Sequence, residues 1–317
     1  MSSTSHTGAV SVEERRVDTA HGSIFVREAP GDGPAVVLMH GFPDDSRIYN
    51  RLIPALAPLR VVAFDWSGYG RSDRRDSTQF SRADRQREML AVLDELDLDH
   101  VVLVGHDSSG PEAVDFAVAH PERVAQVVLL NTYYGRSPQL RLPEMIAVMA
   151  DSAFAPLADA LLDDPDHRLW LLAHTARRFG IDEGQSPDGI AATSIVPQFF
   201  GDAEQPDALA EIRAWTADIP RALDRQDAAV ASGRLDSAAL PVSVIFGRND
   251  TYLNPDVAQH ISGLFTNTKL HLLDQVSHWP QWDQPETVAD LIKRTIAASA
   301  PPSARAEDKD VSFNVDG

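Results

Sequence analysis

The segment Gly105-His-Asp-Ser-Ser-Gly110 directly follows the apolar run Val101-Val-Leu-Val104. A reactive side chain with a small residue two positions away on each side suits a sharp turn from a strand into a helix, which exposes that side chain. Asp107 is the central residue here. A carboxylate that attacks a saturated carbon forms an alkyl ester, which water can then cleave. The sequence therefore predicts covalent catalysis through an ester on Asp107.

Two other interpretations of this segment are open. Ser108 could be the central residue, but His106 would then occupy a tight position and clash, so the steric argument favours Asp107. Asp107 could also be a simple N-cap of the helix that begins near Pro111. That second interpretation leaves the motifs described next unexplained.

A carboxylate and a histidine follow two later strands. Asp250 lies in the turn after the apolar run 242–247, and His278 lies in the loop after the run 269–273. The chain order of nucleophile, acid and histidine is that of a known hydrolytic triad. We expect His278 to take a proton from water, while Asp250 orients the imidazole and stabilises its charged form.

The turn His40-Gly-Phe-Pro43 follows another apolar run. Backbone N–H groups at such a turn and just after the nucleophile bind the oxygen that becomes negatively charged during the reaction. These donors are predicted to be Phe42 and Ser108. We expect a structural role for His40 and a cis peptide bond before Pro43.

Together these motifs resemble the epoxide hydrolase and haloalkane dehalogenase branch of the α/β-hydrolase superfamily, over about residues 15 to 298. The resemblance rests on four segments: His40-Gly-Phe-Pro43, Asp65-Trp-Ser-Gly-Tyr-Gly-Arg-Ser72, Gly105-His-Asp107 and His278-Trp-Pro280. It implies an Asp nucleophile at position 107, assisted by His278 and Asp250, with Phe42 and Ser108 as oxyanion donors. It also implies an α/β fold with a mostly parallel eight-stranded sheet, helices on both faces and an inserted helical cap.

The chain departs from each subfamily at the residues that select a substrate. The tyrosines by which epoxide hydrolase caps protonate the ring oxygen are missing, because no Tyr lies between Tyr134 and Tyr252. Ser108 and Phe42 stand where haloalkane dehalogenases typically have Trp and often Asn. Ser108 and Pro111 stand where fluoroacetate dehalogenases have arginines.

Epoxide opening to a diol is the favoured function, and it needs another proton donor. The candidate donors or substrate contacts are Tyr133, Tyr134, Trp170, His174 and Trp279. Dehalogenation by the same nucleophile is the first alternative. A carbon–carbon bond hydrolase, or a lyase with Asp107 as a base, is the second.

Alternating apolar strands and helical stretches predict the parallel sheet, after an antiparallel hairpin near residues 15–26. The expected division is a core from 11 to 134 and from 240 to 299, interrupted by a helical cap at 135–239. The ends, 1–10 and 300–317, are expected to be disordered.

Composition narrows the function classes. The chain has 317 residues, a formal net charge of −19 and no cysteine. The acidic balance argues against nucleic acid and anionic membranes, and the lack of cysteine excludes disulfides and thiol catalysis. No metal-ligand spacing or long apolar segment is found. We expect a cytoplasmic enzyme, monomeric or homodimeric, that needs no cofactor or metal and takes a small hydrophobic substrate.

Overall fold

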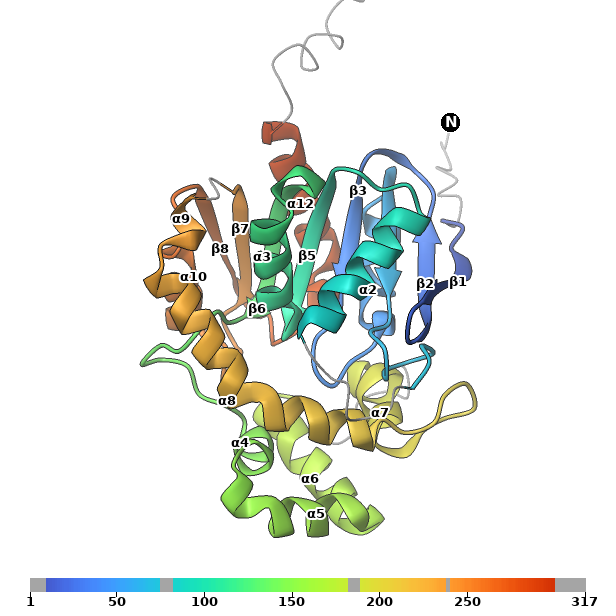
Figure 1. Cartoon of the computed structure of the whole chain (residues 1–317), viewed down its shortest axis with the longest axis vertical. Helices are drawn as coiled ribbons and strands as arrows, with labels where there is room; N and C mark the ends of the chain where they lie inside the picture. The colour runs from blue at the N-terminus through green and yellow to red at the C-terminus, as the bar shows by residue number, and fades with distance from the viewer. Residues whose placement is uncertain (1–9, 75–81, 182–188, 238–239, 300–317) are drawn as a thin grey trace, which may run out of the picture.

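The computed structural model describes residues 10–74, 82–181, 189–237 and 240–299. Its centre is an eight-stranded sheet in the order β1-β2-β4-β3-β5-β6-β7-β8 (Figure 1). The first two strands form the predicted antiparallel hairpin, β2 is antiparallel to β4, and all later pairs are parallel. The strands are β1 (Glu13–Thr19), β2 (Gly22–Ala29), β3 (Asp32–Met39), β4 (Leu59–Phe64), β5 (Val101–Asp107), β6 (Val124–Thr132), β7 (Val242–Gly247) and β8 (Thr268–Leu273).

Helices cover both faces of the sheet, which explains why the central strands are continuous apolar runs. In β5, Leu103 points into one core and Val104 into the other. The helices α2 (Arg82–Glu95) and α3 (Ser109–Ala119) lie on the face toward the viewer in Figure 1, and α12 (Pro285–Ser299) lies behind. The remaining helices of the core are η1 (Ser46–Tyr49), α1 (Leu52–Ala55), η3 (Pro121–Arg123), α10 (Pro255–Ser262) and α11 (Pro280–Asp283).

A helical insertion separates β6 from β7 in the sequence. Its described residues form helices and loops, most of which lie beyond one end of the sheet, while the last of them, within residues 209–237, run back beside the sheet toward the start of β7 (Figure 1). That end carries the carboxyl termini of the parallel strands, where open α/β sheets place their sites. Its helices are α4 (Glu144–Ala150), η4 (Ser152–Phe154), α5 (Ala155–Asp163), α6 (Pro165–Arg178), η5 (Ala191–Ile195), α7 (Val196–Phe200), α8 (Leu209–Ala231) and α9 (Arg234–Ser237).

Two further predictions concern the ends of the chain and membrane spans. The expected disordered ends lie outside the described residues, apart from Val10 at the start. Within the described residues no single helix is long and apolar enough to cross a membrane, although α4 with the segment Ser152–Asp163 passes the length and composition test as a pair bent by 92°.

Candidate active site

Asp107 lies at a strained turn between β5 and α3. Its φ is +47°, a left-handed conformation that side chains rarely adopt, and α3 begins two residues later. Gly105 makes the turn possible, because a Cβ there would lie 2.6 Å from the backbone oxygen of Ser109. A Cβ at Gly41 would lie 2.6 Å from the Cβ of Asp107. The local geometry therefore matches the predicted elbow centred on Asp107.

Backbone amides hold one oxygen of the Asp107 carboxylate. The N–H of Phe42 donates to Asp107 Oδ2 at 3.0 Å, and Phe42 precedes Pro43 in the expected cis peptide bond. Burial raises the pKa of Asp107, while the charge of His278 and the amides of Phe42 and Ser108 lower it. The two predicted oxyanion donors therefore both lie at this carboxylate, and they bias it toward the ionised form.

The structure brings Asp250 and His278 together. His278 Nδ1 donates to Asp250 Oδ2 at 2.6 Å, and both side chains are buried. Asp250 Oδ1 accepts hydrogen bonds from the backbone N–H groups of Tyr252 and Leu253 at 2.9 and 3.1 Å. Because Nδ1 carries the proton that binds Asp250, the second ring nitrogen is available to receive one.

Asn131 is a residue of this network that sequence reasoning missed. It is fully buried at the end of β6, and its Nδ2 donates to Asp250 Oδ2 at 2.9 Å. Its Oδ1 accepts the N–H of Gly247 at 2.8 Å, so one side chain ties the end of β6 to the end of β7. The available signal in the sequence was an asparagine at the end of an apolar strand, where open α/β sheets place their sites.

The carboxylates around His278 determine its protonation. Burial alone would lower the pKa of His278, but Asp250, Asp107 and Asp44 together raise it to about 9. Burial opposes ionisation of Asp250 too, yet the charge and hydrogen bond of His278 hold the pKa of Asp250 below its usual range. The imidazolium is thus favoured while Asp107 is ionised.

A second buried pair lies beside this network. Asp44 is buried and accepts a hydrogen bond from Trp279 Nε1 at 3.3 Å, and its Oδ2 lies 3.6 Å from His106 Nδ1. Burial is the main reason that the pKa of Asp44 rises to about 7. His106 Nε2 donates to the backbone oxygen of His278 at 2.9 Å and thereby supports the histidine loop.

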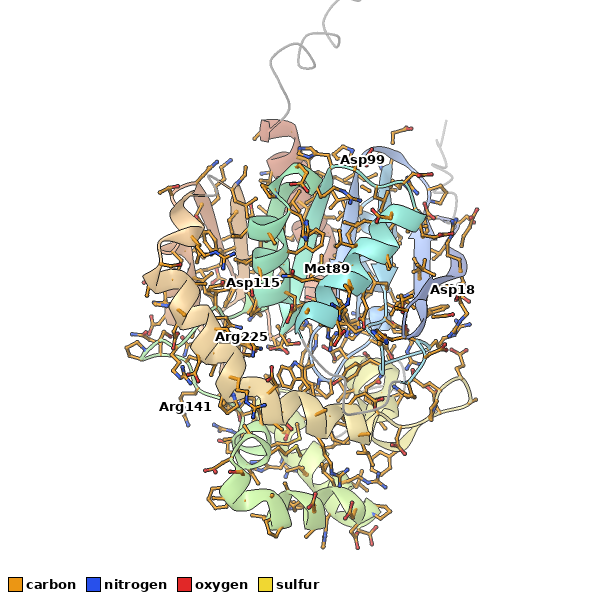
Figure 2. All side chains as sticks on the ribbon, in the orientation of Figure 1. Asp18, Met89, Asp99, Asp115, Arg141 and Arg225 are labelled. Carbon is orange, nitrogen blue, oxygen red and sulfur yellow. The ribbon has the colours of Figure 1, made fainter. Side chains whose placement is uncertain are left out.

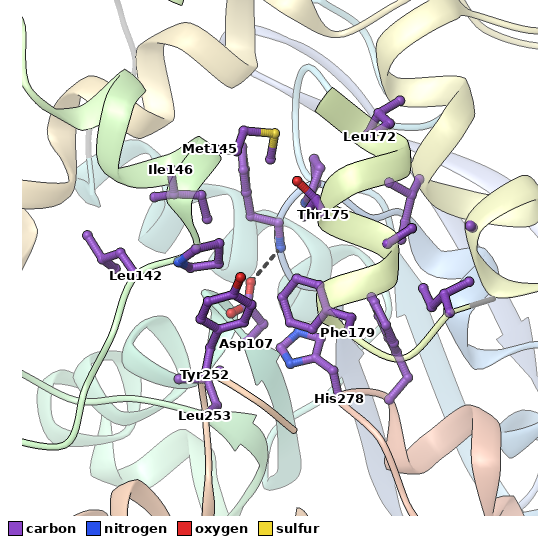
Figure 3. Close-up of a pocket in the computed structure, with 18 of the residues that line it drawn as sticks. Asp107, Leu142, Met145, Ile146, Leu172, Thr175, Phe179, Tyr252, Leu253 and His278 are labelled. Carbon is purple, nitrogen blue, oxygen red and sulfur yellow. Dashed lines mark hydrogen bonds between the residues drawn. The ribbon is translucent and has the colours of Figure 1, made fainter. Parts of the chain in front are cut away.

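A cavity of about 390 Å³ opens above these groups. Figure 3 shows Asp107 and His278 at its base, with Tyr252 and Phe179 beside them. Most of the other residues that line it are apolar and come from the helical insertion and the loops before it. A largely apolar cavity with few polar groups at one end is typical of a site for a small hydrophobic molecule.

The two adjacent tyrosines differ completely in position. Tyr133 lines the cavity, and no hydrogen bond to its hydroxyl is formed by the part of the chain that the structure describes. Tyr134 is buried away from the cavity, and its hydroxyl donates at 2.7 Å to Asp115 on α3, labelled in Figure 2. The prediction that Tyr134 serves as a proton donor is therefore corrected, because its hydroxyl points into the core.

Two candidates on α6 also lie elsewhere. Trp170 is 58% exposed and stacks on His174, and neither side chain lines the cavity. The helix turns a neighbouring stripe, containing Leu172 and Ala173, toward the cavity instead. Trp170 and His174 therefore share a face of α6 that does not border the cavity.

Trp279 does line the cavity, although its indole nitrogen is bonded to Asp44. Sequence reasoning did not assign a site role to Phe179 or Tyr252. The ring of Phe179 lies 4.8 Å from that of His278 and 5.0 Å from that of Tyr252. The Tyr252 hydroxyl donates to Glu144 at 2.5 Å and accepts from Arg178 at 3.3 Å, so it joins the core to α4 and α6.

Metal binding has no support among the side chains that can be described. No group of three or more His, Cys, Asp or Glu residues in the described ranges is arranged to hold a metal ion. The histidines near the site are His106 and His278, and each has a specific protein partner. That the enzyme needs no metal or cofactor stays a prediction.

The family model described as "alpha/beta hydrolase fold" matches residues 34–285, which is most of the chain. The protein belongs to the α/β-hydrolase family. Its relatives place this α/β-hydrolase in the branch predicted from the sequence, among epoxide hydrolases and haloalkane dehalogenases.

Two curated relatives and one solved structure illustrate that placement. The chain is 29% identical to haloalkane dehalogenase 2 of Mycobacterium bovis, over 88% of this chain and 93% of that one. It is 27% identical to bifunctional epoxide hydrolase 2 of Sus scrofa, over 85% of this chain but only 52% of that one. The solved structure of the epoxide hydrolase CorEH is 20% identical in sequence and matches with a TM-score of 0.67. The match covers 92% of this chain and 100% of that chain, which shows a shared fold.

Proposed function

We propose that this α/β-hydrolase opens an epoxide to a diol through an alkyl ester on Asp107, beneath a cap formed by residues 135–239. The hydrogen bond from Phe42 N–H to Asp107 Oδ2 is the observation that carries the proposal. It fixes one carboxylate oxygen and leaves Oδ1 to attack the ring carbon. The ring carbon–oxygen bond breaks as the Oδ1–carbon bond forms.

Tyr133 is the proposed donor of the proton that the ring oxygen needs. It lines the cavity, and its hydroxyl has no hydrogen-bond partner among the described residues. Burial and the charge of Asp107 raise the pKa of Tyr133, so the hydroxyl keeps its proton until an alkoxide develops beside it. Tyr133 thus replaces the cap tyrosines that the sequence lacks.

The second step cleaves the ester. A water molecule attacks Cγ of Asp107 and gives a proton to His278, which Asp250 orients. The amides of Phe42 and Ser108 hold the oxyanion of the tetrahedral intermediate. Collapse of the intermediate releases the diol, which takes the proton from His278 and leaves Asp107 as a carboxylic acid. Exchange through solvent moves that proton to the Tyr133 phenolate, which restores both groups.

Mass spectrometry of the His278→Gln variant tests the proposal. With an epoxide, the variant should gain the mass of one substrate, mapped to the peptide that contains Asp107. Asp107→Ala should gain none. In single turnover in ¹⁸O water, the wild-type enzyme should incorporate one labelled oxygen into Asp107, whereas a base would take up none. If neither epoxides nor alkyl halides gave a mass adduct on His278→Gln or ¹⁸O label in Asp107 of the wild-type enzyme, the proposed ester intermediate would be refuted.

Dehalogenation is the second candidate. The relation to haloalkane dehalogenase 2 favours it, as does Trp215, an aromatic cavity residue that stacks on Phe42 at 3.8 Å between ring centroids. A halide leaves without a proton, so the two candidates differ in their need for Tyr133. Tyr133→Phe should slow ester formation from epoxides by about 10²–10⁴-fold and leave ester formation from alkyl halides unchanged. Tyr134→Phe is the matched control.

A further inference from the structure

The cavity reaches the protein surface at a point far from Asp107. Leu169 on α6 and Val196 on α7 both line it, and they are 59% and 38% exposed. A side chain that borders the cavity and also contacts solvent marks an opening. We name the passage from the base of the cavity to this opening, between α6 and the pair η5 and α7, the apolar slot.

One wall of the apolar slot follows α6. Leu169, Leu172, Ala173 and Ala176 lie three and four residues apart and share the face that lines the cavity. The same helix ends beside Phe179, whose ring contacts that of His278. Ten residues of α-helix from Leu169 to Phe179 rise about 15 Å. The slot therefore leads from the triad to the surface along that length.

The opposite wall is formed by η5 and the start of α7. Ala191, Ala192, Ile195 and Val196 line the cavity from this side. The walls are joined near the opening by Arg168, which donates to the backbone oxygen of Phe199 at 3.0 Å and lies over the ring of Phe200. Small alanine side chains line the cavity from both walls, Ala173 and Ala176 on α6 and Ala191 and Ala192 on η5.

Arg141, which also lines the cavity, comes from the loop before α4, and the residues that α6, η5 and α7 contribute to the slot include no charged side chain. Thr175 is its one polar member, and its hydroxyl already donates to the backbone oxygen of Leu171 at 2.9 Å. A polar group would lose hydrogen bonds to water there without gaining a partner. An unbranched hydrocarbon chain loses nothing and gains contact on both sides.

We infer that the substrate carries its reactive group at one end of an unbranched apolar chain, which occupies the apolar slot. This inference rests on the proposed role of Asp107, because it places the reactive carbon at the triad. Carbon–carbon bonds of about 1.5 Å advance an extended chain by about 1.25 Å per carbon, so the slot accommodates roughly a dozen carbons. The substrate class is a long-chain terminal epoxide.

Chain-length kinetics test the inference. For a series from 1,2-epoxybutane to 1,2-epoxytetradecane, kcat/KM of the wild-type enzyme should rise by up to about fourfold per methylene until the chain reaches the opening. Ala173→Phe and Ala192→Phe should remove this gain for long epoxides and leave 1,2-epoxybutane unaffected. Ala217→Phe, on an exposed position of α8, should behave as the wild-type enzyme.

A variant at the protein surface tests the same inference without the risk that a large side chain inside the slot prevents folding. Leu169→Asp changes an exposed side chain and should reduce kcat/KM only for chains long enough to reach it. A flat wild-type profile, or variants that lower kcat/KM equally for all chain lengths, would overturn the slot while the ester on Asp107 still formed in His278→Gln. Absence of that ester would instead overturn the proposed function.

Discussion

Neutralising Asp107 should lower the pKa of His278. The rise of that pKa from 6.5 to about 9 corresponds to about 3 kcal/mol in favour of the imidazolium. Asp250 makes the largest favourable contribution, followed by Asp107 and Asp44, against the opposing effect of burial. Removing one charge of the three should lower the pKa by about 1.

Asp107→Asn provides that perturbation, because the side-chain amide is neutral, like the ester that Asp107 forms in the proposed reaction. At pH 7.5 the neutral fraction of His278 should therefore rise several-fold. Titration of ¹⁵N-labelled imidazoles by NMR, with the His278 signal assigned from His278→Gln, measures the change. Asp107→Ala repeats the loss of charge without an amide, and Asp94→Asn, an exposed residue on α2, is the control. An unchanged pKa in both Asp107 variants would refute the electrostatic coupling.

Three other variants test the surroundings of the site. Asp44→Asn removes a charge that raises the pKa of His278, so the pH at which ester hydrolysis becomes half-maximal should move down, as measured by decay of the ester in rapid-quench experiments. Gly105→Ala places a Cβ against the backbone of the turn and should lower the free energy of unfolding by about 1–3 kcal/mol in urea titrations. Asn131→Ala leaves the Gly247 N–H without its partner and should lower that free energy by about 1–3 kcal/mol while slowing hydrolysis more than ester formation.

The sheet could be predicted because strands that are buried on both faces consist of continuous apolar residues, a pattern that is easily recognised in the sequence. Strands such as β5 and β7 are continuous apolar runs, and turn residues bound them. The insertion was less predictable. The longest helix, α8, continues through Pro220 to Ala231. Proline usually ends a helix, so the local rule failed where the rest of the helix packs well enough to tolerate it.

The site was predictable where chemistry restricts residue type and position together. Asp107, Asp250 and His278 each follow a strand, and the parallel sheet brings those strand ends to one edge. Asn131 and Tyr252 were missed because their roles depend on long-range contacts that leave no local pattern. Tyr133 and Tyr134 show the limit most clearly, since adjacent residues of the same type point to opposite environments.

In the proposed mechanism, the charges at the site order the two steps. While Asp107 is ionised, the imidazolium of His278 stabilises it and cannot accept a proton from water. Ester formation removes the negative charge of Asp107 and with it part of the stabilisation of the imidazolium. His278 then loses its proton more readily and can activate water against the ester. The same carboxylate therefore serves as the nucleophile while it is charged and, once it is an ester, allows His278 to act as the base.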